Sequence, residues 1–323
     1  MIRSIFRNGE SRLETRIGIV ELPESGFLWL AASQPDEATM AELRRQFRVD
    51  PQLQGTSVHE DEEYVYLFAE LVSMNEQREP VVHRVTFVLG DRLLVTLHDT
   101  VDFTPLNRAM QRLARHPGQA TDARSLMRMI LAGINDSTSQ VIERIATDLE
   151  ASADAIASLS RAAGGDGREL GVADLSETLI KLNDSEALIS NCLESQLALA
   201  RVARYLNGEV DGRRDPELQL LVTELAQDIN GVKEHAAFEH DKVRYLQNSV
   251  VGLLNIKQNQ IVKVFTVITA VFLPPTLVAT FYGMNFAVMP ELSWQYGFTA
   301  AIVLTFAAAL LPLAYIKRKG WLR

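Results

Sequence analysis

Residues 264–282 read VFTVITAVFLPPTLVATFY and residues 296–316 read YGFTAAIVLTFAAALLPLAYI, and neither stretch contains a charged side chain. A helix of about 20 apolar residues crosses a hydrocarbon core about 30 Å thick, so each stretch is long enough to span a membrane. Trp294 and Tyr296 stand where an interfacial aromatic belt is expected. We therefore predict two membrane-spanning helices, at about 262–282 and about 296–316, rather than two buried helices of a soluble protein.

The charges around these stretches predict how the chain crosses the membrane. The tail 317–323 is basic, with Lys317, Arg318, Lys319 and Arg323. Because positively charged flanks stay on the cytoplasmic side, we expect the C-terminus and the long N-terminal part in the cytoplasm. The loop 283–295 is then expected on the far side of the membrane. The N-terminus shows no apolar segment typical of a signal peptide, which agrees with this topology.

The chain of 323 residues has a formal net charge of −9, but this charge is divided unevenly. Residues 1–240 carry a net charge of −15, whereas residues 241–323 carry +6. An acidic body is not typical of a nucleic-acid partner, and the single cysteine excludes a disulfide framework. No phosphate-binding Gly-x-x-x-x-Gly-Lys-Ser/Thr motif and no persuasive catalytic arrangement is visible. We therefore expect neither an enzyme nor a nucleotide-driven pump, and no organic cofactor.

Residues 1–120 have the pattern of a small domain that mixes helices and strands. Runs rich in β-branched and aromatic residues predict strands, and Pro35 with Asp36 predicts the start of a helix that ends near Phe47. The predicted strands are 26–31, 64–69, 81–89 and 92–97. The region is long enough to bury a core of its own.

Residues 121–260 change to a helical period. Apolar side chains fall on one helical face up to Gly164, and on a second such face up to Gly208. Long helices that are joined by short glycine-containing loops are antiparallel neighbours by default. This region is therefore predicted to form a long-helix cytoplasmic stalk.

A third helix is predicted to begin at Pro216, because proline suits the first position of a helix. Its apolar seam keeps a 4-3 spacing for about five heptads and is interrupted only by Glu239. No proline follows before Pro274, so the helix is predicted to continue into the first membrane span, over roughly 100 Å. The predicted fold is thus an α+β domain, a helical stalk and, over 261–323, a membrane domain with two transmembrane helices.

A second stripe of residues follows this third helix into the membrane. It carries amides, hydroxyls and a few apolar side chains, roughly on the face opposite the apolar seam. We define the polar stripe as Asn255, Asn259, Val262, Thr266, Thr269, Leu273, Thr276 and Thr280. A lone helix would not turn such a face toward lipid, whereas several copies in a ring would turn it toward a shared axis. Two interpretations stay open, a pore lining and hydroxyls that bond between packed helices; the asparagines favour the pore.

The loop after the first span carries a motif. It reads Tyr282-Gly283-Met284-Asn285-Phe286 and continues Met289-Pro290-Glu291-Leu292. This closely resembles the CorA family of divalent-cation channels, which transport magnesium, cobalt and nickel. The signature of that family is a Gly-Met-Asn loop after the first of two C-terminal spans. The resemblance is close over residues 245–323 and architectural over the rest of the chain.

The resemblance implies a homopentameric funnel in the bacterial inner membrane, with the loop 283–295 on the periplasmic side. It implies Mg²⁺ as the main substrate, with Co²⁺ and Ni²⁺ also carried, and Asn285 as a ring at the outer mouth. Tyr282, Gly283 and Met284 complete the selectivity loop, and Glu291 lies in the outer loop. Because Mg²⁺ releases its water reluctantly, neutral amides that hydrogen-bond the intact water shell suit this ion. Leu273 and Val262 are expected to form apolar constrictions.

A passive inward path needs a mechanism that closes it, and the family uses acidic sites between subunits as a Mg²⁺ sensor. In this sequence Glu217, Glu224 and Asp228 form a stripe on the third helix, and the segment Met74-Asn75-Glu76 can supply the partner. Mg²⁺ is therefore expected as a regulatory ligand as well as a substrate. The alternative is that these carboxylates form an ordinary solvated helix face.

Three functions stay open at this point. The first is a Mg²⁺ channel with metal feedback, in which the membrane potential drives influx. The second is a Zn²⁺ or Co²⁺/Ni²⁺ transporter on the same scaffold, and Met284 favours the first over it because zinc-transporting relatives usually carry Val there. The third is a two-span membrane sensor that transports nothing.

Overall fold

The computed structural model describes residues 2–7, 13–50, 58–100, 102–163, 172–210, 212–284, 289 and 293–320. The chain divides into two compact units. The first comprises Met1–Leu159 and Thr178–Gln247, and the second comprises Ser160–Glu177 and Asn248–Arg323.

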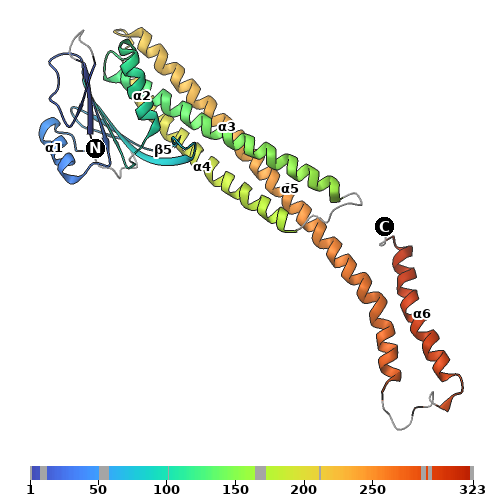
Figure 1. Cartoon of the computed structure of the whole chain (residues 1–323). Helices are drawn as coiled ribbons and strands as arrows, with labels where there is room; N and C mark the ends of the chain where they lie inside the picture. The colour runs from blue at the N-terminus through green and yellow to red at the C-terminus, as the bar shows by residue number, and fades with distance from the viewer. Residues whose placement is uncertain are drawn as a thin grey trace. The chain divides into compact units, whose positions relative to one another are not determined.

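A seven-stranded mixed sheet lies at the N-terminal end of the first unit (Figure 1). Its strands are β1 (Ile2–Arg7), β2 (Glu14–Ile17), β3 (Phe27–Ser33), β4 (His59–Glu60), β5 (Val65–Met74), β6 (Pro80–Leu89) and β7 (Leu93–His98). Their order is β2-β1-β3-β7-β6-β5-β4. Only β3 and β7 pair in parallel, and every other neighbouring pair is antiparallel.

Helices account for most of the remaining described chain. They are α1 (Glu37–Phe47), α2 (Thr104–Arg115), the short 3₁₀ turn η1 (Pro117–Gln119), α3 (Ala123–Ala163), α4 (Val172–Glu209), α5 (Pro216–Tyr282) and α6 (Gly297–Arg318). The helix α5 is 67 residues long and belongs to both units. It confirms the prediction of one continuous helix from Pro216 into the first membrane span.

The sheet is buried on both faces. On one face Leu28, Leu30 and Val95 pack with Leu43 and Phe47 of α1. On the other face the strands pack against α2, α3, α4 and the first part of α5, in a core that includes Trp29, Leu67, Phe87, Leu106, Ile130, Leu199 and Leu225. Because strands that are buried on both faces read as nearly continuous apolar runs, the central strands were visible in the sequence.

The four predicted strands and the first helix are confirmed, with strand ends shifted by up to five residues. Asp36 caps α1, and its carboxylate accepts a hydrogen bond from the backbone N–H of Thr39 at 2.9 Å. The sequence did not predict β1, β2 and β4. Arg3 and Arg7 conceal the strand pattern of β1, β2 is fully exposed, and β4 has only two residues.

The open edge of β5 is closed by hydroxyl side chains from two long helices. The backbone N–H of Val72 donates to Ser195 of α4, and that of Met74 donates to Ser137 of α3, both at 3.0 Å. The hydroxyl of Thr138 donates to the carbonyl of Val72 at 2.7 Å. Unpaired strand edges are exposed to pairing with other chains, so these contacts protect β5 and fix the sheet to the helical stalk.

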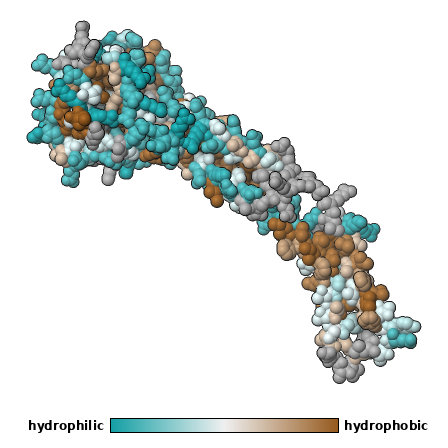
Figure 2. Space-filling model, viewed as in Figure 1, coloured by the Kyte–Doolittle hydropathy of each residue, from teal (hydrophilic) through white to brown (hydrophobic). Residues whose placement is uncertain are grey.

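The second unit contains the two apolar segments. Both α5 and α6 include an 18-residue apolar window, and within one chain almost none of either window is buried. Figure 2 shows hydrophobic residues gathered over these segments, whereas the N-terminal domain is mostly hydrophilic on the face shown. Apolar side chains that stay exposed to this extent require lipid or further protein around them.

Candidate ion-permeation site

The polar stripe lies on one continuous helix, and all eight of its positions are exposed in the single chain. Its two aliphatic members are also open, with Val262 55% and Leu273 59% exposed. The structure therefore places all eight residues on α5 without covering any of them from within the chain. Two amides stand just before the uncharged segment and a row of hydroxyls runs within it. Such a polar face favours water or other protein against it rather than lipid.

Three threonines of the stripe share one hydrogen-bonding arrangement. The hydroxyls of Thr266, Thr276 and Thr280 donate to the carbonyls four residues earlier, at 2.7–2.8 Å. A threonine hydroxyl has one proton to donate and two lone pairs that accept. Because the proton is used within the helix, the oxygen of each exposed hydroxyl is left as an acceptor. Acceptors are what the water molecules of a hydrated cation require, since those waters direct their protons outward.

Two prolines stand inside α5 at the level of Leu273, namely Pro274 and Pro275. Proline has no N–H, so each leaves one carbonyl of the preceding turn without its helical donor. The carbonyls concerned are those of Ala270 and Val271. Helices in membranes tolerate such carbonyls where other groups or water satisfy them. The middle of the first span therefore offers backbone acceptors in addition to the threonine oxygens.

The selectivity loop predicted from the sequence is described only in part. Tyr282 ends α5, and the N–H of Gly283 donates to the carbonyl of Ala279 at 3.0 Å. A side chain at position 283 would place its Cβ 3.2 Å from that carbonyl oxygen, which is a tight contact. Met284 follows and is 43% exposed. Asn285 and Glu291 lie outside the described residues.

The three predicted regulatory carboxylates are exposed on α5. Glu217, Glu224 and Asp228 all lie in the first unit. Across the part of the chain that the structure describes, no three His, Cys, Asp or Glu side chains gather closely enough to hold a metal ion. One chain alone therefore does not assemble the predicted regulatory site.

Arg128 is a residue near this acidic face that the sequence did not single out. Burial lowers the pKa of its guanidinium, and the charge of Glu224 partly opposes that shift. Its Nε is buried and has no hydrogen-bond partner among the described residues. A cation close to Glu224 competes with any metal for that carboxylate. The apolar helical pattern around Arg128 gave no signal of this proximity.

The predicted partner segment, Asn75 and Glu76, lies in the turn between β5 and β6. It borders an open cleft of about 1000 Å³ between this turn, α2 and α3. The same cleft is lined by Arg78, Arg108 and Arg144. Within one chain the surroundings of Glu76 are therefore at least as basic as they are acidic.

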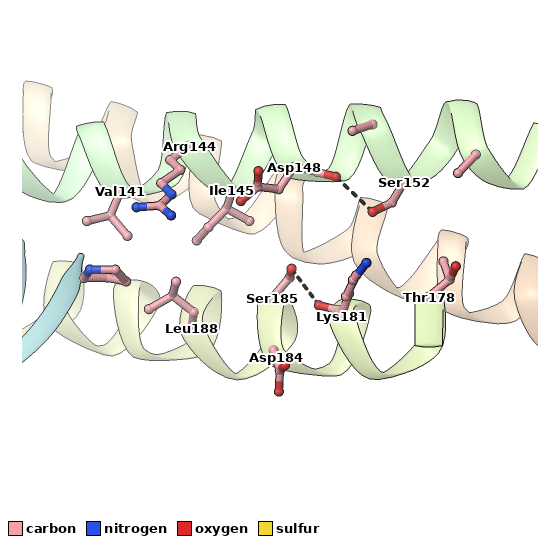
Figure 3. Close-up of a pocket in the computed structure, with 13 residues that line it drawn as sticks. Val141, Arg144, Ile145, Asp148, Ser152, Thr178, Lys181, Asp184, Ser185 and Leu188 are labelled. Carbon is pink, nitrogen blue, oxygen red and sulfur yellow. Dashed lines mark hydrogen bonds between the residues drawn. The ribbon is translucent and has the colours of Figure 1, made fainter. Parts of the chain in front are cut away.

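A second cleft, of about 500 Å³, lies between α3 and α4 (Figure 3). Val141, Ile145 and Leu188 give it an apolar lining. The hydroxyls of Ser152 and Ser185 donate to carbonyls of their own helices at 2.9 Å. The cleft thus has an apolar lining with a polar rim, and it holds none of the predicted site residues.

These features define an integral membrane protein with two C-terminal spans. A large domain precedes the spans, and the polar stripe gives the first span a polar face.

The particular family follows from comparison with known proteins. A family model described as CorA-like Mg²⁺ transporter protein matches residues 24–318, so the chain belongs to this family. This confirms the resemblance seen in the motif, and the family consists of transporters rather than enzymes.

Similar proteins cover almost the whole chain. The magnesium transport protein CorA of Escherichia coli is 31% identical, over 99% of each chain. The protein of the same name from Salmonella typhimurium is also 31% identical, over 96% of this chain and 98% of its own length. The complete structure of the CorA magnesium transporter from Methanocaldococcus jannaschii matches with a TM-score of 0.75, at 18% identity and 98% coverage of both chains. That match confirms the predicted fold class.

Proposed function

We propose that this chain is the subunit of a homopentameric Mg²⁺ channel of the bacterial inner membrane, which also passes Co²⁺ and Ni²⁺. Family membership and the magnesium transport named for its relatives support the proposal. The observation that carries it is the polar stripe, in which an uncovered row of threonines on the first membrane span continues from two asparagines on α5 just before the span. We assign to residues 1–120 and 121–260 the cytoplasmic domain and stalk, and to 261–323 the membrane domain.

Exposed apolar side chains on the stalk support assembly from several copies. On α5, Leu220, Phe238 and Tyr245 are 59%, 66% and 71% exposed. Phe238 and Tyr245 precede Asn259 of the polar stripe by three heptads and two heptads. In a coiled-coil-like assembly, positions that share a heptad register share a face. The face of α5 that carries the polar stripe would then also carry subunit contacts nearer the domain.

In the proposed channel, five copies of the polar stripe surround a hydrated ion. The oxygens of Thr276 and Thr280 accept hydrogen bonds from its water shell, so the ion is not stripped of water. Val262 and Leu273 form the apolar constrictions, which hold back water when the pore is narrow. Asn285 forms the ring at the outer mouth, with Tyr282, Gly283 and Met284 around it and Glu291 in the loop nearby.

The membrane potential supplies the driving force for inward flow. With both termini in the cytoplasm, a divalent ion that crosses about 100 mV gains roughly 4.6 kcal/mol. This corresponds to more than three decades of concentration ratio, so no organic cofactor is needed. Cytosolic Mg²⁺ bound between subunits at Glu217, Glu224 and Asp228 would screen the repulsion between five acidic bodies and close the pore.

Uptake into proteoliposomes tests the proposal. The purified full-length protein is reconstituted with an interior-negative potential, and entry of Mg²⁺, Co²⁺, Ni²⁺ and Zn²⁺ is measured separately. We expect Mg²⁺ entry in the native protein and at least a tenfold loss in Asn285→Ala, because the amide ring is absent. Asn230→Ala, an amide of α5 far from the membrane spans, serves as the control and is expected to match the native rate.

Two outcomes contradict the proposal in different ways. Entry of Zn²⁺ without Mg²⁺ would identify a zinc transporter on the same scaffold. Absence of any metal flux from the correctly inserted native protein would favour a two-span membrane sensor.

A further inference from the structure

Five cations lie at the ends of the two membrane spans. We name Lys257, Lys263, Lys317, Arg318 and Lys319 the basic collar. Lys263 directly precedes the uncharged stretch that begins at Val264, and Lys317 directly follows the one that ends at Ile316. Because the two spans cross the membrane in opposite directions, these two ends lie at the same membrane boundary. The five charges therefore meet one leaflet.

Within the described part of the structure, nothing neutralises the charges of the basic collar. None of the five cations forms an ion pair with any residue in the described part of the structure. Along α5 the last acidic residue before the membrane is Asp241, sixteen positions before Lys257. Lys317, Arg318 and Lys319 are all exposed. A cluster of cations without ion-pair partners among the described residues attracts anions from its surroundings.

Exposed apolar side chains lie directly beside these cations on the membrane side. On the membrane side of Lys263, Val264 is 58% exposed, and one turn before Lys319, Tyr315 is 64% exposed. The Nζ of Lys319 lies 6.0 Å from the centre of the Tyr315 ring. The surface therefore pairs an anion-binding rim with an apolar wall that continues into the membrane.

From this pairing we infer that the basic collar binds the phosphate headgroups of anionic phospholipids, with their acyl chains against the neighbouring apolar side chains. A free phosphate would use only the cations, whereas a phospholipid uses both parts of the surface. Clusters of basic residues directly at the end of a membrane helix attract anionic lipids in this way. The inference depends on the membrane spans and not on ion transport, so it stands or falls separately from the proposed channel.

The test uses purified, full-length protein in an uncharged detergent at low salt. The midpoint of thermal unfolding is measured during titration with phosphatidylglycerol, with phosphatidylcholine of the same acyl chains, and with inorganic phosphate. We expect phosphatidylglycerol to raise this midpoint in a saturable way. Phosphatidylcholine is expected to raise it much less, and phosphate is expected to have little effect. The rise is expected to weaken at high salt, because salt screens exposed charges.

Three variants assign the effect to the collar. The triple change Lys317→Gln, Arg318→Gln and Lys319→Gln is expected to raise the phosphatidylglycerol concentration at half-effect on the order of 100-fold, at about fivefold per cation. The matched control removes three exposed cations from the stalk, Arg201→Gln, Arg204→Gln and Arg244→Gln, and is expected to leave that concentration unchanged. The double change Lys317→Arg and Lys319→Arg keeps the charges and is expected to keep the affinity.

Several results would overturn the inference. Equal stabilisation by the two lipids would show that only the apolar wall matters. An equal effect of inorganic phosphate would identify a site for a free anion. An identical loss in the stalk control would reduce the effect to net charge, without a specific role for the collar.

Discussion

At the scale of single residues, two buried histidines show how the sheet interior responds to acid. The ring of His83 contacts the hydroxyls of Ser73 and Thr100, at 3.0 and 2.8 Å. His98 lies close by, and both rings pack against Phe103, with centroid distances of 4.5 and 5.7 Å. Burial lowers the pKa of both imidazoles, and that of His98 falls to about 4. Both side chains are therefore neutral in the folded domain near neutral pH.

This gives a prediction about acid stability. In the unfolded chain His98 titrates near 6.5, so between that pH and about 4 only the unfolded state binds the proton. The stability contributed by neutral His98 is fully present above pH 6.5 and is lost as the pH falls toward 4, by roughly 3 kcal/mol. The free energy of unfolding of the full chain, measured across this pH range, is expected to depend much less steeply on pH in His98→Gln than in the native protein. Identical pH profiles would contradict the assignment.

At the scale of elements, α5 carries one carboxylate in its apolar seam. Glu239 is only 3% exposed. Its two oxygens lie 3.8 Å from Nε2 of His235 and 3.3 Å from Nζ of Lys242, both on the same helix. One of these oxygens, Oε2, has no hydrogen-bond partner among the described residues. The desolvation of a buried charge is expensive, and a single ion pair seldom offsets it.

Replacement of Glu239 is therefore expected to stabilise the stalk. Glu239→Leu restores the apolar seam, and the melting temperature of the full chain is expected to rise, in line with the 1–4 kcal/mol typical of such changes. Lys242→Met leaves the carboxylate buried without its cation and is expected to lower the melting temperature. A lower melting temperature in both variants would mean that the ion pair of Glu239 with Lys242 is a net source of stability.

At the scale of the whole molecule, the proposed closure of the pore by Mg²⁺ depends on carboxylates that one chain does not bring together. Glu224 and Asp228 are exposed, and Glu224 lies close enough to Arg128 to influence its pKa. A metal that binds there must compete with this cation. Mg²⁺ sensing is thus expected to belong to the assembly and not to the separate subunit.

Neutralisation of these acids is expected to weaken the shut-off without removing transport. In proteoliposomes that contain the double variant Glu224→Gln and Asp228→Asn, Mg²⁺ influx is expected to continue at lumenal Mg²⁺ concentrations that inhibit the native protein, with at least a tenfold shift. The control double variant Glu234→Gln and Asp241→Asn removes two other exposed acids of α5. Unchanged inhibition in the first variant, or an equal shift in the control, would contradict the assignment.

The parts of the fold that the sequence predicted are those with strong periodicity. Uncharged stretches, a sustained apolar seam and strands buried on both faces are local patterns, and all three are confirmed. The arginines of β1 concealed its strand, because their charge interrupts the apolar pattern while the backbone pairs within the sheet. The start of α3 at Ala123 lies two residues after the predicted change to a helical period at 121, although apolar residues there serve the sheet core as well as the helix.

The candidate site was predictable only where it follows a single helix. The polar stripe lies on α5 as its spacing predicted, because positions on one helix share a face by geometry alone. The proximity of Arg128 to Glu224 joins α3 to α5 and leaves no trace in local spacing. The contacts of Ser137 and Ser195 with the edge of β5 were also not predictable from local spacing, since these hydroxyls lie 63 and 123 residues from their partners.

Those hydroxyls have a consequence for the synthesis of the chain. The edge of β5 leaves the ribosome well before α3, and its last contact waits for Ser195, which is made 123 residues after Val72. Until then the nascent sheet presents an open edge to other nascent chains on the same message. The order of the sequence limits this exposure, because Ser195 is translated before the first membrane span begins. The order of the sequence therefore allows the sheet edge to close before insertion of the first span into the bilayer starts.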